Sequence, residues 1–147
     1  MIITTGKVNL TGLLAELGIC PMMAADNITQ LYADRSVLVL GRGAKLPEKL
    51  SVFAVVADAD EGINTEGLKG SAVVTCGMGS RNTVSVSSRT AERITLALNR
   101  SIPTLNGACD PMELPVSLRE GISDYEYMAA FAALLLLDKW HELQRCG

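Results

Sequence analysis

Three consecutive segments decide the fold, and they read Ser51-Val-Phe-Ala-Val-Val-Ala-Asp58, Ser71-Ala-Val-Val-Thr-Cys-Gly77 and Arg81-Asn-Thr-Val-Ser-Val-Ser-Ser88. The first two are short apolar runs rich in β-branched residues that end at Asp or Gly, which is typical of strands buried on both faces of a sheet. The third alternates polar and apolar side chains, which is the period of a strand with one face in water. Two buried strands followed by a half-exposed strand predict an α/β sheet.

Apolar spacing predicts further elements on both sides of this stretch. The pattern Asn106-Gly107 favours a hairpin turn, and Pro115 restricts the second strand of that hairpin to a sheet edge. Ser123-Asp-Tyr-Glu126 is a capping box that opens the last helix, whose residues are apolar on all sides. In chain order we expect strands at 1–5, 36–40, 102–105 and 112–118, and helices at 8–17, 26–32, 91–98 and 123–137.

Length and composition indicate one soluble unit covering residues 1–147. Apolar residues make up 48% and charged residues 20%, so a disordered chain is excluded. The net charge of −3 and the aromatic content of 4% exclude a nucleic-acid partner, which would need a basic surface with stacking side chains.

The first residues lack the pattern of a signal peptide, so we expect a cytoplasmic protein. The longest uncharged apolar run, Tyr127 to Leu137, is shorter than the roughly 20 residues of a membrane span. The four cysteines form no C-x-x-C pair, and the chain has one histidine, which predicts free thiols in a reducing compartment and no zinc site.

Two polar groups at strand ends are candidate binding sites. Asp58 and Asp60 would fall on one face of an extended segment and could hold a magnesium ion through oxygen ligands. The alternative is that acidic residues next to Gly simply end the strand. Gly77, Gly79 and Arg81 could form an anion-binding loop of backbone N–H groups, or the two glycines could serve only to permit positive φ angles.

Two weaker motifs have simpler explanations. Gly41-Arg-Gly43 follows a strand, as in dinucleotide-binding loops, but Leu46 stands where the third glycine belongs, so a tight turn is the alternative. Cys76 as a nucleophile would need a base, and the single histidine, His141, belongs to the end of the last helix.

The order of the elements resembles the central ATP-binding domain of the Mur ligases and folylpolyglutamate synthetases. Ile3-Thr-Thr-Gly-Lys7 with the helix after it is similar to the family's nucleotide loop, and the Ala-rich segment 127–134 is similar to the helix that closes that domain. The segments Val55 to Asp60 and Ala72 to Gly77 resemble its buried strands. The resemblance implies a three-layer α/β fold whose mostly parallel sheet carries an antiparallel hairpin extension at one edge, with nucleotide bound at Thr5, Gly6 and Lys7.

The loop departs from the family's pattern, which requires glycine where Met1 stands and a hydroxyl where Val8 stands. Only Thr4 and Thr5 separate the strand from Gly6, so few backbone N–H groups remain to wrap a triphosphate. We therefore expect a non-catalytic module for binding or assembly that has lost the ATP machinery and needs no cofactor.

Two other hypotheses are open. The chain could be a small enzyme subunit that binds a nucleotide or phosphate ligand, with ATP and Mg as cofactors, through Lys7, the Asp58 and Asp60 pair, and the loop from Gly77 to Arg81. It could also be a scaffold that only self-associates. For the non-catalytic module, the apolar helix Met128 to Leu137 is a candidate surface for a homodimer, and the alternative is that this helix is sandwiched in the core.

Overall fold

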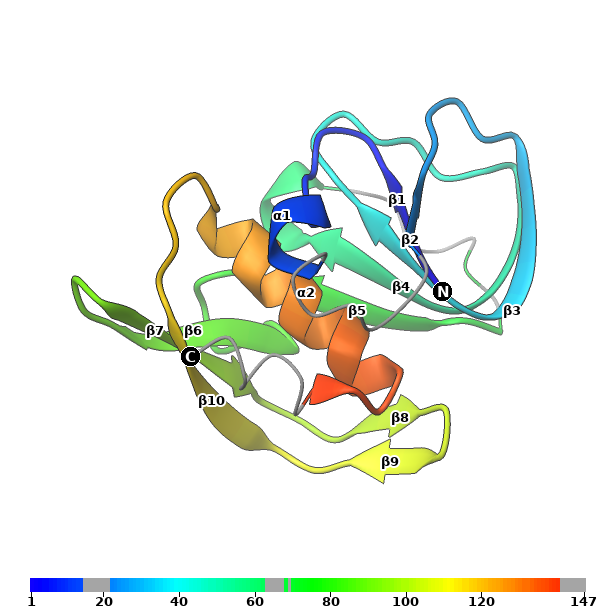
Figure 1. Cartoon of the computed structure of the whole chain (residues 1–147). Helices are drawn as coiled ribbons and strands as arrows, with labels where there is room; N and C mark the ends of the chain where they lie inside the picture. The colour runs from blue at the N-terminus through cyan, green and yellow to red at the C-terminus, as the bar shows by residue number, and fades with distance from the viewer. Residues whose placement is uncertain (15–21, 63–67, 69, 141–147) are drawn as a thin grey trace.

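The computed structural model of the chain describes residues 1–14, 22–62, 68 and 70–140 (Figure 1). Of these residues, 46% lie in strands and 17% in helices. The helical elements are α1 (Thr11–Leu14), the 3₁₀ turn η2 (Ala59–Glu61) and α2 (Asp124–Leu136). The strands are β1 (Ile2–Thr5), β2 (Met22–Ala24), β3 (Gln30–Leu40), β4 (Lys49–Asp58), β5 (Ala72–Cys76), β6 (Val84–Arg89), β7 (Arg93–Leu98), β8 (Ile102–Thr104), β9 (Gly107–Cys109) and β10 (Met112–Ser117).

Eight of these strands form one mixed sheet in the order β10-β7-β6-β5-β4-β3-β1-β2. The six strands β2, β1, β3, β4, β5 and β6, in their spatial order, pair in parallel. At the other end of the sheet β7 pairs antiparallel with both β6 and β10. Strands β8 and β9 form a separate hairpin with Leu105 and Asn106 in its turn and Gly107 at the start of β9. The predicted pairing of 102–105 with 112–118 is therefore wrong, because β10 pairs with β7 instead. Pro115 lies in β10, which is an edge strand as predicted, because proline has no N–H to donate to a second neighbour.

The predicted three-layer α/β fold of the Mur-ligase type is wrong, because the protein is mostly β. Residues 91–98 were predicted to be a helix but form β7, and the helix predicted at 26–32 is replaced by a turn and the start of β3. Part of the helix predicted at 8–17 is the single turn α1, and its later residues lie outside the described part of the chain.

The two faces of the sheet are covered differently. On one face α2 packs against strands β3 to β8, and Leu13 and Leu14 of α1 complete the same cluster of buried residues. On the other face the described cover consists of strand ends and loops, which contribute Ile28, Leu46 and Leu68. No helix covers that face among residues 22–62, 68 and 70–140.

Helix α2 is enclosed by its own chain. It begins at a capping box, in which Ser123 Oγ accepts from the Glu126 N–H while Glu126 Oε1 accepts from the Ser123 N–H. Every residue from Tyr127 to Leu136 is at most 3% exposed. Figure 1 shows why, since the twisted sheet curves around α2, with α1 on one side and the β8–β9 hairpin near its end. The predicted homodimer surface at 128–137 is therefore wrong, because this helix has no face left for a second subunit.

Candidate functional site

The parallel strands place several loops at one end of the sheet. The turn 5–7 follows β1, the segment 26–29 follows β2 and the loop 42–48 follows β3, so all three lie at the carboxyl ends of neighbouring strands. They enclose a pocket of about 590 Å³. In the strand order β4-β3-β1-β2, the connection after β1 runs outward to β2 and the connection after β3 runs in the opposite direction to β4. Adjacent strands with oppositely directed connections mark the place where open parallel sheets bind ligands.

The turn at Gly6 and Lys7 has no backbone N–H group left for a phosphate. The Gly6 N–H donates to Asp26 Oδ1 at 3.1 Å, and the Lys7 N–H donates to the Arg42 carbonyl at 2.9 Å. The next two N–H groups are also used, because Val8 donates to the Gly6 carbonyl at 3.1 Å and Asn9 donates to Glu126 Oε2 at 2.6 Å. A phosphate loop works through free N–H groups. In this turn the Asp26 carboxylate accepts the hydrogen bond from the Gly6 N–H that a phosphate oxygen would otherwise accept.

The backbone of the turn at Gly6 and Lys7 packs closely against the backbone of residues 41–44. A Cβ on Gly41 would lie 2.6 Å from the Lys7 carbonyl carbon, and a Cβ on Gly6 would lie 2.9 Å from the Arg42 carbonyl oxygen. The two segments also exchange a second hydrogen bond, from the Arg42 N–H to the Lys7 carbonyl. Only glycine at both positions permits this approach. The glycines of Gly41-Arg-Gly43 therefore serve a tight turn, in which the Ala44 N–H donates to the Gly41 carbonyl.

Asp58 caps a turn in this structure. Its Oδ1 accepts from the Asp60 N–H at 2.9 Å and thereby starts η2, which ends at Gly62 with φ of +63°. Asp60 itself is exposed. Among the described residues no group of three or more His, Cys, Asp or Glu side chains could hold a metal ion. The Asp58 carboxylate therefore has the strand-ending role that the sequence left open, and magnesium binding by Asp58 and Asp60 stays a prediction.

The loop from Gly77 to Arg81 folds on itself. The Gly79 carbonyl accepts from both the Asn82 N–H at 3.1 Å and Asn82 Nδ2 at 3.0 Å, and the Arg81 carbonyl accepts from the guanidinium of Arg100. A Cβ on Gly77 would lie 2.5 Å from Asn82 Nδ2, so a larger residue there would have to displace the Asn82 side chain that binds the Gly79 carbonyl.

The structure brings some of the predicted residues together and separates others. Asp58 pairs with Cys76 across β4 and β5, so the aspartate pair and the Gly77 loop are neighbours. Lys7 follows β1, with β3 between it and β4. An ion pair between Arg42 and Glu61, with 3.9 Å between nitrogen and oxygen, spans the intervening loops. All three groups lie at the same end of the sheet, but neither the aspartate pair nor the Gly77 loop lines the pocket that Lys7 lines.

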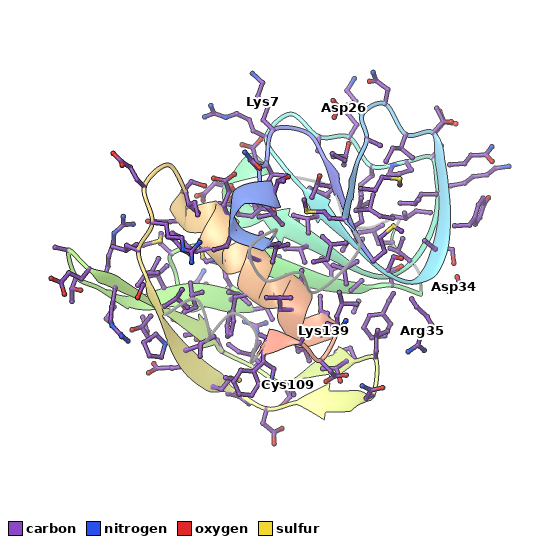
Figure 2. The ribbon with its side chains drawn as sticks, viewed as in Figure 1. Lys7, Asp26, Asp34, Arg35, Cys109 and Lys139 are labelled. Carbon is purple, nitrogen blue, oxygen red and sulfur yellow. The ribbon has the colours of Figure 1, made fainter. Side chains whose placement is uncertain are left out.

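The sequence pattern did not predict the other charged residues of the pocket. Asp26, Arg42, Lys45 and Glu48 come from segments that are distant from Lys7 in sequence, and they line the pocket with it. Figure 2 shows Lys7 and Asp26 on neighbouring loops at one end of the molecule. Of these residues, only Arg42 belonged to a recognised motif, the glycine pair at 41–43.

Cys76 and Tyr125 lie at the same end of the sheet as the pocket, and the pKa of each is raised. Burial, and next the Asp58 carboxylate, raise the pKa of the Cys76 thiol far above its ordinary value. Burial also raises the pKa of Tyr125, with smaller contributions from Cys76, Asp58 and Glu61. The Tyr125 hydroxyl donates to the Leu40 carbonyl at the end of β3. A neutral buried thiol is a poor nucleophile. His141, the base considered for it, lies outside the described residues.

These two groups predict alkaline instability. Because each pKa is raised in the folded state, the folded chain keeps protons that the unfolded chain loses above their ordinary pKa values of 9.0 and 10.0. The free energy of unfolding should be constant with respect to these groups below pH 9 and should fall as the pH rises above it. Urea denaturation at a series of pH values from 7 to 11 measures how steeply the free energy of unfolding falls with pH. Cys76→Ala should flatten the part that begins near pH 9, and an unchanged slope in that variant would contradict the assignment to Cys76.

Comparisons with known proteins give no relative. No protein-family model matches the chain, and no curated protein matches it. None of the helices in the described part of the chain has the length and hydropathy to cross a bilayer.

Proposed function

We propose that this chain is a non-catalytic binding or assembly module of the cytoplasm. The observation that carries the proposal is the closed turn after β1, where the N–H groups of Gly6, Lys7, Val8 and Asn9 all donate within the chain. A ligase or kinase needs such groups free, because phosphoryl transfer relies on backbone donors, lysine and metal ions around the phosphates.

The relation to the Mur ligases stays a prediction from the loop and the Ala-rich helix. The alternative function, a small enzyme subunit with a nucleotide or phosphate ligand, is favoured by one observation, which is that Lys7, Asp58 and the Gly77 loop lie at the same end of the sheet. Two observations favour the module instead. The Asp58 carboxylate caps η2, and the Gly79 carbonyl binds Asn82 in a closed turn.

Mg-ATP binding is the test. We expect no heat of binding in calorimetry, no shift of the melting temperature at millimolar Mg-ATP and no phosphate release, because the N–H groups that would hold the triphosphate already donate within the chain. A ligand that binds the folded state raises the melting temperature in proportion to the logarithm of its concentration over Kd.

A matched pair of variants makes the result decisive. Lys7→Ala removes the lysine of the loop, and Lys49→Ala removes an exposed lysine outside the pocket. The proposal would be refuted if Mg-ATP raised the melting temperature by several degrees and if Lys7→Ala abolished this rise while Lys49→Ala preserved it. That result would support the nucleotide-binding alternative.

A further inference from the structure

We propose that the pocket at the carboxyl ends of β1, β2 and β3 binds a small organic anion, held by the side chains of Lys7 and Lys45. The inference rests on the proposed function, since it names the ligand class of a module that binds without catalysis. It places recognition on side chains instead of the backbone N–H groups that are already used.

The charges of the pocket favour an anion. Lys7, Arg42 and Lys45 line it together with Asp26 and Glu48, which leaves one excess positive charge. Asp26 is engaged by the Gly6 N–H, and Arg42 lies 3.9 Å from Glu61. Neither Lys7 nor Lys45 forms an ion pair with any described residue. Two exposed ammonium groups at the rim of one concave site are suited to a compact negative group.

The floor of the pocket favours a ligand with an apolar part. Ile28, Ala44 and Leu46 line it, and all three are half-buried against the second core cluster of the sheet. A volume of about 590 Å³ lies within the range of pockets that hold small molecules. The ligand would place its apolar part on Ile28 and Leu46 and its anionic group between the two lysines.

The same geometry excludes a long polyphosphate chain. The Asp26 carboxylate accepts from the Gly6 N–H at the base of the turn, so a second anion there would meet a like charge. The anionic group must therefore stay at the rim and be compact. A carboxylate and a monophosphate share this chemistry.

An NMR titration of the ¹⁵N-labelled full chain tests the inference. The probes are butyrate, phenyl phosphate and, as a cationic control of similar size, butylamine. We expect butyrate or phenyl phosphate to shift the amide signals of residues 26–29, 42–46 and 48, and we expect butylamine to leave them unchanged. Tighter binding of butyrate would assign a carboxylate ligand, and tighter binding of phenyl phosphate would assign a monophosphate.

Three exposed lysines provide the matched variants. Lys7→Gln and Lys45→Gln should each weaken binding about tenfold, the size of one hydrogen bond to a charged group. Lys49→Gln, outside the pocket, should leave the affinity unchanged, and Lys45→Glu should abolish binding. Circular dichroism checks that each variant is folded.

Two outcomes would overturn the inference. Absence of anion binding would do so, as would equal weakening by Lys49→Gln and Lys45→Gln. Neither outcome would contradict the proposed function. The proposed function is contradicted by a different result, which is Lys7-dependent binding of Mg-ATP.

Discussion

Phe131→Ala should lower the free energy of unfolding by about 3–5 kcal/mol, as expected when a large aromatic side chain is removed from a core that cannot collapse around the cavity. Phe131 is fully buried near the middle of α2, where the sheet surrounds the helix. Domains of this kind are stable by about 5–15 kcal/mol, so the loss is a large share of the total. Urea denaturation followed by circular dichroism measures it.

The other phenylalanine of the chain is the control. Phe53 lies in β4 and packs against the same cluster, but it is only half-buried. Phe53→Ala should therefore lower the free energy of unfolding clearly less than Phe131→Ala does. Equal costs for the two variants would contradict the enclosed position of α2, and with it the argument that this helix cannot serve as a dimer surface.

Local sequence was sufficient to predict the elements whose pattern has a single interpretation. The strands around Val55 and Val74 were predicted correctly, because an apolar β-branched run between turn residues is typical of a buried strand. Burial on both faces holds for the centre of β4, whereas in β5 only Val74 and Cys76, on one face, are fully buried. The capping box at Ser123 was confirmed, because its two hydrogen bonds depend only on residues three apart. The prediction that Pro115 lies at an edge was confirmed for a similarly local reason.

The failures arose where the partner of a segment decides its structure. Ile94 and Leu98 are spaced for a helix, but Ile94, Leu96 and Leu98 also have the period of a strand, and all three are buried. Pairing with β6 on one side and β10 on the other selects the strand. At 26–32, Asn27 adopts φ of +56°, which a helix does not permit, and Gln30 pairs with Lys49.

The candidate site was predictable only in part for the same reason. Lys7 stood out because it follows a glycine at a strand end, but the carboxylate that closes its turn comes from Asp26, after a different strand. The order β3-β1-β2 brings the two together, and sequence spacing does not reveal that order. The sequence predicts from missing residues that this turn cannot wrap a triphosphate, and the structure adds that the N–H groups of residues 6–9 already donate within the chain.

The closed turn itself can be tested through its glycines, because two of them have nearly the same backbone angle and different surroundings. Gly6 has φ of +79° and Gly43 has φ of +74°. A Cβ on Gly6 would lie 2.8 Å from Ala44 Cβ and 2.9 Å from the Arg42 carbonyl oxygen, whereas a Cβ on Gly43 would meet nothing within 4 Å. The pair therefore separates backbone strain from close contact.

We expect Gly43→Ala to lower the free energy of unfolding by about 1–2 kcal/mol, the cost of a left-handed conformation for a residue with a Cβ. Gly6→Ala should cost about 2–4 kcal/mol, because it adds overpacking to the same strain and pushes the turn away from the 41–44 loop. Urea denaturation gives both values, and amide exchange at Lys7 and Arg42 should accelerate in Gly6→Ala alone as their mutual hydrogen bonds lengthen. Equal losses in the two variants would mean that the turn and the loop are not in contact, and the proposal that this contact excludes a triphosphate would lose its physical basis.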